Sequence, residues 1–178
     1  MSNVRRLSKK AGAGPLATPT DLGNNAVAAI AAAINGLVAD SFVLYLKTKN
    51  YHWHMSGKHF RDYHLMLDEH ADSIQAGIDP LAERVRKLGG ETIHSYDEVL
   101  KLTSLKESDE GFLKPEAMFV QLIADNKTVV KNMREAHEIC DKHGDAASAG
   151  LLETAIDDAE RRLWFLFETN QIRGDSGS

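Results

Sequence analysis

The sequence predicts an all-α fold, a four-helix bundle in which one long connection crosses the molecule. Apolar residues recur at helical spacing through four long stretches, whereas strand-like alternation and internal repeats are not visible. Only four prolines and 7% aromatic residues favour helices over a β-sandwich. At 178 residues the chain suits one domain with a sizeable core. Four helices of about 28 residues each, with a longer link after the second, are typical of a bundle with a single crossover.

The first half of the chain contains two predicted long helices. The first is expected to start at Leu22, after an N-cap at Thr20 or Asp21, and to stop near Gly57, with apolar residues at helical spacing as far as about Tyr51. The second is expected over residues 59–88 and is followed by Gly89-Gly90, which is a typical helix end because glycine readily adopts the left-handed conformation found there. Both helices are long enough to span a bundle.

The second half of the chain begins with the connection and continues with two further helices. Ser95 is a suitable cap for a short helix over "SYDEVLKL" inside the connection. The third long helix is expected to start near Pro115, a favourable first-turn residue, and to end before Gly144. The fourth is expected from Asp145 to about Ile172.

The chain divides into three expected regions. Residues 1–20 form a flexible basic tail, residues 21–173 form the bundle, and residues 174–178 form a flexible C-terminus. The opening segment is rich in Gly, Ala, Ser, Thr and Pro, so it buries too little surface to offset its ordering entropy. Its basic residues are Arg5, Arg6, Lys9 and Lys10. Subtracting these four positive charges from the net charge of −5 leaves −9 for an acidic body.

Composition also indicates the compartment. A single cysteine, Cys140, excludes an internal disulfide framework and suits a reducing cytosol. The longest apolar run, "AVAAIAAAI", is too short and too alanine-rich to cross a bilayer. No charged-then-apolar N-terminal segment with a cleavage site is visible, so we do not expect secretion.

The second predicted helix contains two pairs of potential metal ligands. His64 and Asp68 are four residues apart, as are Asp79 and Glu83, so each pair shares a helix face. All four fall within an arc of about 100°, yet Asp68 and Asp79 are separated by about 16 Å along the axis. One ion therefore cannot contact both pairs. Two copies of the helix, packed antiparallel across a two-fold axis, would place the pairs opposite each other and form two identical sites.

His52, near the end of the first helix, can complete the half formed by His64 and Asp68. The ligand set is then two imidazoles and three carboxylates, which suits Fe(II) or Mn(II), with Zn(II) as a competitor. No thiolate is placed to make a structural zinc site. An open site with several carboxylates, which prefer Fe(III), favours binding Fe(II) and oxidising it.

Simpler interpretations exist for several of these residues. Asp79 precedes Pro80, so it could instead be the N-cap of a helix that restarts after a kink. Glu91 and His94 match the E-x-x-H pattern of di-iron bundles, but they follow Gly-Gly in a connection and the pattern occurs once, so we reject it. The remaining histidines individually suit surface or packing roles: His54, His59, His70, His94, His137 and His143.

These residues resemble the motifs of the Dps family, the DNA-binding proteins from starved cells, which are miniature ferritins. The matching motifs are "HWHMSGKHFRDYHLMLD", from His52 to Asp68, and "DPLAERVRKLGG", from Asp79 to Gly90. The layout of the helices matches over about residues 20–172. The resemblance implies a ferritin-like four-helix bundle with a short extra helix between helices two and three, and a hollow cage of twelve subunits.

The resemblance also implies a ferroxidase activity at two-fold interfaces. One subunit would supply His52, His64 and Asp68, and its mate would supply Asp79 and Glu83. In the family, Fe(II) is oxidised there by hydrogen peroxide or oxygen, the ferric product is stored as mineral, and DNA is protected. Iron is the expected metal, with zinc or manganese as substitutes.

The resemblance also bears on five further residues. Asp72 is a candidate outer-shell or second-metal residue, and Trp53 is a candidate redox neighbour, with simple packing as its alternative. Asp141 and Asp145 lie at the turn that builds acidic ion-entry pores in the family, although surface acids are common. Tyr63 replaces a residue that is usually aliphatic, and its hydroxyl is a potential donor near the site.

The basic tail is a candidate DNA-binding segment, with a solubilising tail as the alternative. Twelve tails on one cage can engage phosphates multivalently, so we expect non-specific, salt-sensitive binding. No recognition-helix signature is visible. We therefore expect a cytoplasmic, bacterial nucleoid-associated protein with no membrane partner.

Two other functions remain open. One is an architectural DNA-compacting protein with a vestigial metal site, which the basic tail permits equally well. The other is a plain helical interaction module, which would leave the two matched motifs unexplained. The five retained ligand residues favour the iron-oxidising, iron-storing cage.

Overall fold

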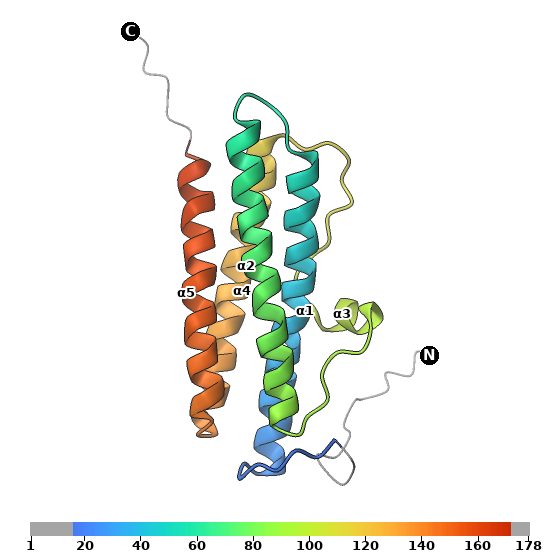
Figure 1. Cartoon of the computed structure of the whole chain (residues 1–178), viewed down its shortest axis with the longest axis vertical. Helices are drawn as coiled ribbons and strands as arrows, with labels where there is room; N and C mark the ends of the chain where they lie inside the picture. The colour runs from blue at the N-terminus through green and yellow to red at the C-terminus, as the bar shows by residue number, and fades with distance from the viewer. Residues whose placement is uncertain (1–15, 172–178) are drawn as a thin grey trace.

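A computed structural model describes residues 16–171, and within that range it contains five helices and no strand. The helices are α1 (Asn24–His54), α2 (Phe60–Lys87), α3 (Tyr96–Leu102), α4 (Pro115–Lys142) and α5 (Ala146–Thr169). The four long helices lie side by side, and the short α3 lies beside α1 outside the bundle (Figure 1). The prediction of an all-α bundle with a short extra helix in its central connection is confirmed.

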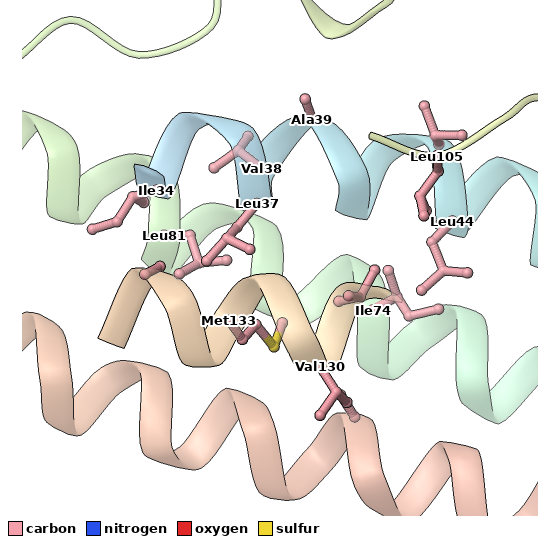
Figure 2. Close-up of a cluster of buried hydrophobic side chains, with 14 of the residues drawn as sticks. Ile34, Leu37, Val38, Ala39, Leu44, Ile74, Leu81, Leu105, Val130 and Met133 are labelled. Carbon is pink, nitrogen blue, oxygen red and sulfur yellow. The ribbon is translucent and has the colours of Figure 1, made fainter. Parts of the chain in front are cut away.

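The four long helices enclose one hydrophobic core. α1 packs against α2 and α4, and α5 packs against α4 and α2, so the helices form a closed ring. Figure 2 shows part of this core, where Ile34 and Leu37 of α1 meet Leu81 of α2 and Met133 of α4. Full burial of such a side chain stabilises the fold by about 1.5–3 kcal/mol. The core therefore holds α1 and α2 in a fixed relative position.

The start of α1 differs from the prediction. Its N-cap is Gly23 rather than Thr20 or Asp21, and no side chain caps it. The Thr20 hydroxyl instead accepts a hydrogen bond from the Leu22 N–H (3.3 Å), so it is already used in the preceding turn. The predicted cap of α3 is confirmed, because the Ser95 hydroxyl accepts a backbone N–H of the first turn.

α2 continues without interruption through Pro80, so the alternative of Asp79 as an N-cap is wrong. Proline removes one N–H donor and leaves the carbonyl of Ala76 without its helical partner. Ala76 is exposed, so water can satisfy that carbonyl. Ile74 and Leu81, on either side, are buried in the core and hold both halves of the helix in line.

The turns on either side of α2 require glycine. Gly57 has a φ of 108° between α1 and α2, and Gly89 has a φ of 79° after α2, which confirms the predicted helix end. A Cβ on Gly89 would also lie 2.9 Å from the Thr18 carbonyl oxygen. α1 ends at His54, close to the predicted end near Gly57, so His52 and His54 of the first motif lie within the helix.

The chain ends lie largely outside the described residues. α5 ends at Thr169, earlier than the predicted end near Ile172, which is itself outside that range. Most of the predicted tail and the whole predicted C-terminal segment also fall outside it, so the three-region division stays a prediction. The same holds for the candidate DNA-binding residues Arg5, Arg6, Lys9 and Lys10.

α1 is, among the described residues, the helix long and apolar enough to span a membrane by length and composition. Of its most apolar window, 61% is buried inside the protein. It contacts α2, α3 and α4, so its apolar residues are used in the bundle. This is the pattern of a core helix.

Polar contacts attach the crossover connection to α1. The Asp40 carboxylate, on a residue only 2% exposed, accepts hydrogen bonds from the Thr103 hydroxyl (2.8 Å), the Ser104 N–H (2.6 Å) and the Asn132 amide (2.9 Å). These donors come from the end of α3 and from α4. Because a buried carboxylate needs such partners, Asp40 joins three segments at one point.

Candidate metal centre

His52 and His64 form a reciprocal pair at the corner between α1 and α2. The Nδ1–H of His52 donates to the His64 carbonyl (2.8 Å), and the Nδ1–H of His64 donates to the His52 carbonyl (2.9 Å). The two rings stack with centroids 3.7 Å apart and an interplanar angle of 22°. Because a carbonyl only accepts, Nδ1 carries the proton in both rings, and each Nε2 is left with a free lone pair in the neutral form.

The local sequence accounts for this arrangement. α1 ends at His54, so the carbonyl of His52 in the last turn has no helical partner. The imidazole of His64 supplies that missing donor from the following helix. Gly57 permits the tight turn that brings the start of α2 back beside the end of α1. Helix termination and ligand orientation therefore depend on the same hydrogen bond.

Asp68 lies one turn after His64 and faces the same pair. Its Oδ1 atom is 3.8 Å from the Nε2 of His52, and the side chain is 44% exposed. Lys49 of α1 contacts the same Oδ1 atom through its Nζ at 2.6 Å. The hydrogen bond from Lys49 is the main cause that lowers the pKa of Asp68, so the carboxylate is ionised at neutral pH. These residues form one half of the predicted site.

The second pair of carboxylates lies further along α2. Asp79 and Glu83 are both exposed, and Glu83 contacts Lys87 at 3.1 Å. Asp79 lines a shallow cavity of about 310 Å³ with Phe42, Ile78 and other residues of α1 and α2. Within the described residues, no group of three or more His, Cys, Asp or Glu side chains has the geometry to hold a metal ion. A single chain therefore does not bring the two pairs together.

The neighbouring candidates differ in exposure. Trp53 is 58% exposed, so it does not pack into the core of this chain, and the Lys49 Nζ lies 5.9 Å from its ring centroid. Asp72 is also exposed on α2. Tyr63 instead packs edge-on against Phe119, with ring centroids 4.9 Å apart, which accounts for an aromatic residue at that position.

The two candidate pore residues have different environments. Asp145 is only 4% exposed, caps α5 through the Ser148 N–H (3.1 Å), and accepts from the Arg84 guanidinium (2.6 Å). Burial tends to raise the pKa of Asp145, but the bonds from Ser148 and the charge of Arg84 outweigh it, and the pKa is lowered. Asp141 is exposed, with its carboxylate 3.4 Å from Nδ1 of His137.

Sequence reasoning missed Lys49 and an apolar groove. Lys49 lies within one turn of His52 and Trp53, so the helical spacing contained the necessary signal. The groove of about 500 Å³ crosses α1, α2 and α3 and includes Phe42, Leu46 and Ile78. It depends on where the crossover packs α3, which periodicity does not determine.

Comparisons with known proteins agree with this fold. The ferritin-like domain family matches residues 31–172. The DNA protection during starvation protein of Agrobacterium fabrum is 32% identical over 149 residues, covering 84% of this chain and 92% of that protein. Dps from Thermosynechococcus elongatus is structurally similar, with a TM-score of 0.82 at 28% identity, covering 86% of this chain and 98% of that chain.

A third similar protein is the Dps protein of Vibrio cholerae O1, described as a member of a broad superfamily of ferritin-like diiron-carboxylate proteins. Its TM-score is 0.80 at 27% identity, covering 84% of this chain and 94% of that chain. Fold and relatives together define a ferritin-like bundle protein. Within that class, this chain belongs to the Dps family.

Proposed function

We propose that this protein stores iron and protects DNA, and that it oxidises Fe(II) at sites shared by two copies of the chain. The observation that carries the proposal is the reciprocal bonding of His52 and His64, which uses both Nδ1 atoms and leaves the Nε2 of His52 3.8 Å from the Asp68 carboxylate. A neutral imidazole pair beside a carboxylate suits Fe(II). Membership of a family with ferritin-like relatives supports iron as the metal.

The second copy completes the ligand set. Asp79 and Glu83 are exposed on α2 and separated from the histidine pair along the same helix, so a two-fold partner would present them to it. The apolar groove, which shares Phe42 and Ile78 with the cavity that Asp79 lines, supports this contact, because Leu46, Tyr96 and Leu100 leave large apolar surfaces exposed around it. We place the partner's equivalent surface there, within a larger closed assembly of twelve chains.

The chemistry of the shared site is a two-electron reduction of the oxidant. Each of two Fe(II) ions gives up one electron, and the two electrons cleave the O–O bond of one hydrogen peroxide molecule. The resulting ferric ions hydrolyse to oxyhydroxide and release protons to solvent. Carboxylates stabilise the ferric product, whereas the imidazoles retain Fe(II) before oxidation. Molecular oxygen is the alternative oxidant, and Zn(II) or Mn(II) would compete for the same ligands.

Subunit complementation tests the shared site. Chains with His52→Ala and chains with Glu83→Ala are each expected to lose ferric absorbance after addition of Fe(II) and peroxide. In a mixed dimer one site carries both defects and the other carries neither. Random reassembly of equal amounts should therefore restore about a quarter of the sites.

Two further outcomes bear on this experiment. Absence of recovery, with mixed assemblies verified by mass spectrometry, would exclude a site built from two chains. Absence of ferric absorbance from the unchanged protein would instead favour the alternative of an architectural DNA-compacting protein with a vestigial metal site. His54→Ala is the matched control, because His54 is exposed and bonds only the Asn50 carbonyl among the described contacts.

DNA contact is assigned to the N-terminal tail. Four basic residues precede an otherwise acidic chain, which supports a tethered, non-specific phosphate contact in the cytoplasmic nucleoid of a bacterium. Deleting residues 1–14 should abolish DNA retardation in a gel while leaving iron oxidation intact. Retardation of full-length protein should also weaken steeply as salt increases. Equal retardation by both proteins would remove the tail from this function.

A further inference from the structure

Lys49 occupies the position that an incoming cation needs at Asp68. Its ammonium lies 2.6 Å from the Oδ1 atom of Asp68, and Nε2 of His52 lies 3.8 Å from that same oxygen. A divalent ion bound by both His52 and Asp68 would approach that oxygen, where the ammonium now sits. Two cations repel each other strongly at such short separation. The ion pair and the metal complex therefore exclude each other.

The ion pair between Lys49 and Asp68 is less exposed to solvent than an ordinary surface ion pair. The Lys49 side chain is only 17% exposed, so its stem is held against the bundle. It approaches from α1 to a carboxylate on α2, so the pair also joins the two helices that supply the histidines. The carboxylate is thereby placed beside His52 before any metal arrives.

Trp53 provides an alternative position for the released ammonium. It lies one helical turn after Lys49, and the Nζ atom is already 5.9 Å from the indole centroid. At this distance a cation is attracted to the face of the ring. Release of Lys49 from Asp68 can therefore occur by a side-chain movement, without rearrangement of α1.

The other half of the site has a similar but looser arrangement. Lys87 lies 3.1 Å from Glu83, with both side chains more than half exposed. Such exposed pairs are weak and readily exchanged. The difference in exposure makes Lys49, rather than Lys87, the residue whose displacement limits metal entry.

We propose that Lys49 is a positioning residue that holds the Asp68 carboxylate beside His52 in the iron-free protein and must be displaced when a divalent cation binds. The proposal deepens the proposed function, on which it rests, because it concerns the same half-site. It assigns to Lys49 control over the metal concentration at which the site fills.

A titration with Co(II), which is not oxidised under anaerobic conditions, tests this role in the assembled full-length protein. Visible absorption of bound Co(II) reports occupancy directly. Lys49→Met should lower the Co(II) dissociation constant about fivefold, since binding no longer has to break the ion pair. Lys49→Arg retains the charge and should bind no more tightly than the unchanged protein. Lys49→Gln serves in place of Lys49→Met if the latter does not fold.

Lys131→Met is the matched control, because it also removes one lysine from an ion pair, with Glu135 on α4. It should leave the dissociation constant unchanged. Equal or weaker Co(II) binding by the folded Lys49→Met or Lys49→Gln protein overturns the proposal. Asp68→Asn distinguishes a failure of the Lys49 role from a failure of the proposed metal site. If this variant binds Co(II) as tightly as the unchanged protein, Asp68 is not a ligand and the metal site itself is misplaced.

Discussion

Arg84 of α2 and Asp145 at the start of α5 form an ion pair of 2.6 Å across the bundle, with the Asp145 carboxylate almost fully buried. Arg84 also donates to the Ser148 hydroxyl at 2.8 Å. It adjoins Glu83 in the sequence, so the candidate ligand belongs to a helix segment anchored to α5. Asp145 is thus the cap of α5 and the anchor of α2 in this chain.

Removing Arg84 should destabilise the protein strongly. Arg84→Met leaves the buried Asp145 charge without its cation, which we expect to lower the free energy of unfolding by about 3 kcal/mol. Urea denaturation measures the change. Arg134→Met is the control, because Arg134 pairs with Glu160 on the exposed surface, and its loss should change stability by less than about 1 kcal/mol. Equal effects of the two substitutions would contradict the anchoring role.

His70 should make stability sensitive to mild acid. Burial lowers the pKa of His70 to about 4, with Arg162 and Arg161 as further causes. The unfolded chain binds its proton near pH 6.5 and the folded chain does not, so stability is complete above pH 6.5. It falls as pH drops from 6.5 towards 4, by about 3 kcal/mol in total.

Denaturation at a series of pH values measures this slope. His70→Phe removes the titrating group while keeping an aromatic side chain near Phe165, whose ring is 6.3 Å from that of His70. The variant should lose less stability over the same interval. Identical pH profiles for both proteins would show that the pKa of His70 does not change on folding.

His64→Asn should separate structure from metal binding. The asparagine amide can replace the Nδ1–H donor to the His52 carbonyl, but nothing replaces Nε2. We expect stability within about 1 kcal/mol of the unchanged protein. Co(II) affinity should fall at least about tenfold. Calorimetry and the Co(II) spectrum provide the two measurements, and retention of full affinity would exclude His64 as a ligand.

Asp40 should control the attachment of the crossover. Asp40→Ala removes the acceptor shared by Thr103, Ser104 and Asn132, and we expect a loss of about 2 kcal/mol in stability. Hydrogen exchange should accelerate in α3 more than in α4. Uniform acceleration across all the helices would show that Asp40 stabilises the whole bundle rather than this connection.

Local rules account for the parts of the fold that were predicted correctly. Ser95 caps α3 and Gly89 ends α2 because each position is determined by a few neighbouring residues. The same rules failed at Thr20, whose hydroxyl is used in an earlier turn. At Pro80 the predicted continuous helix is confirmed, and the surrounding core keeps α2 in line through the proline.

The sequence by itself determined the four long helices and the placement of two ligand pairs on one face of α2, because helical periodicity is a property of the backbone. It also determined that these pairs are too far apart on one helix for a single ion. The tertiary structure decided the reciprocal bonding of His52 and His64, the contact between Lys49 and Asp68, and the burial of Asp145. These depend on which helices pack together, since their partners come from different helices and meet only when the core forms.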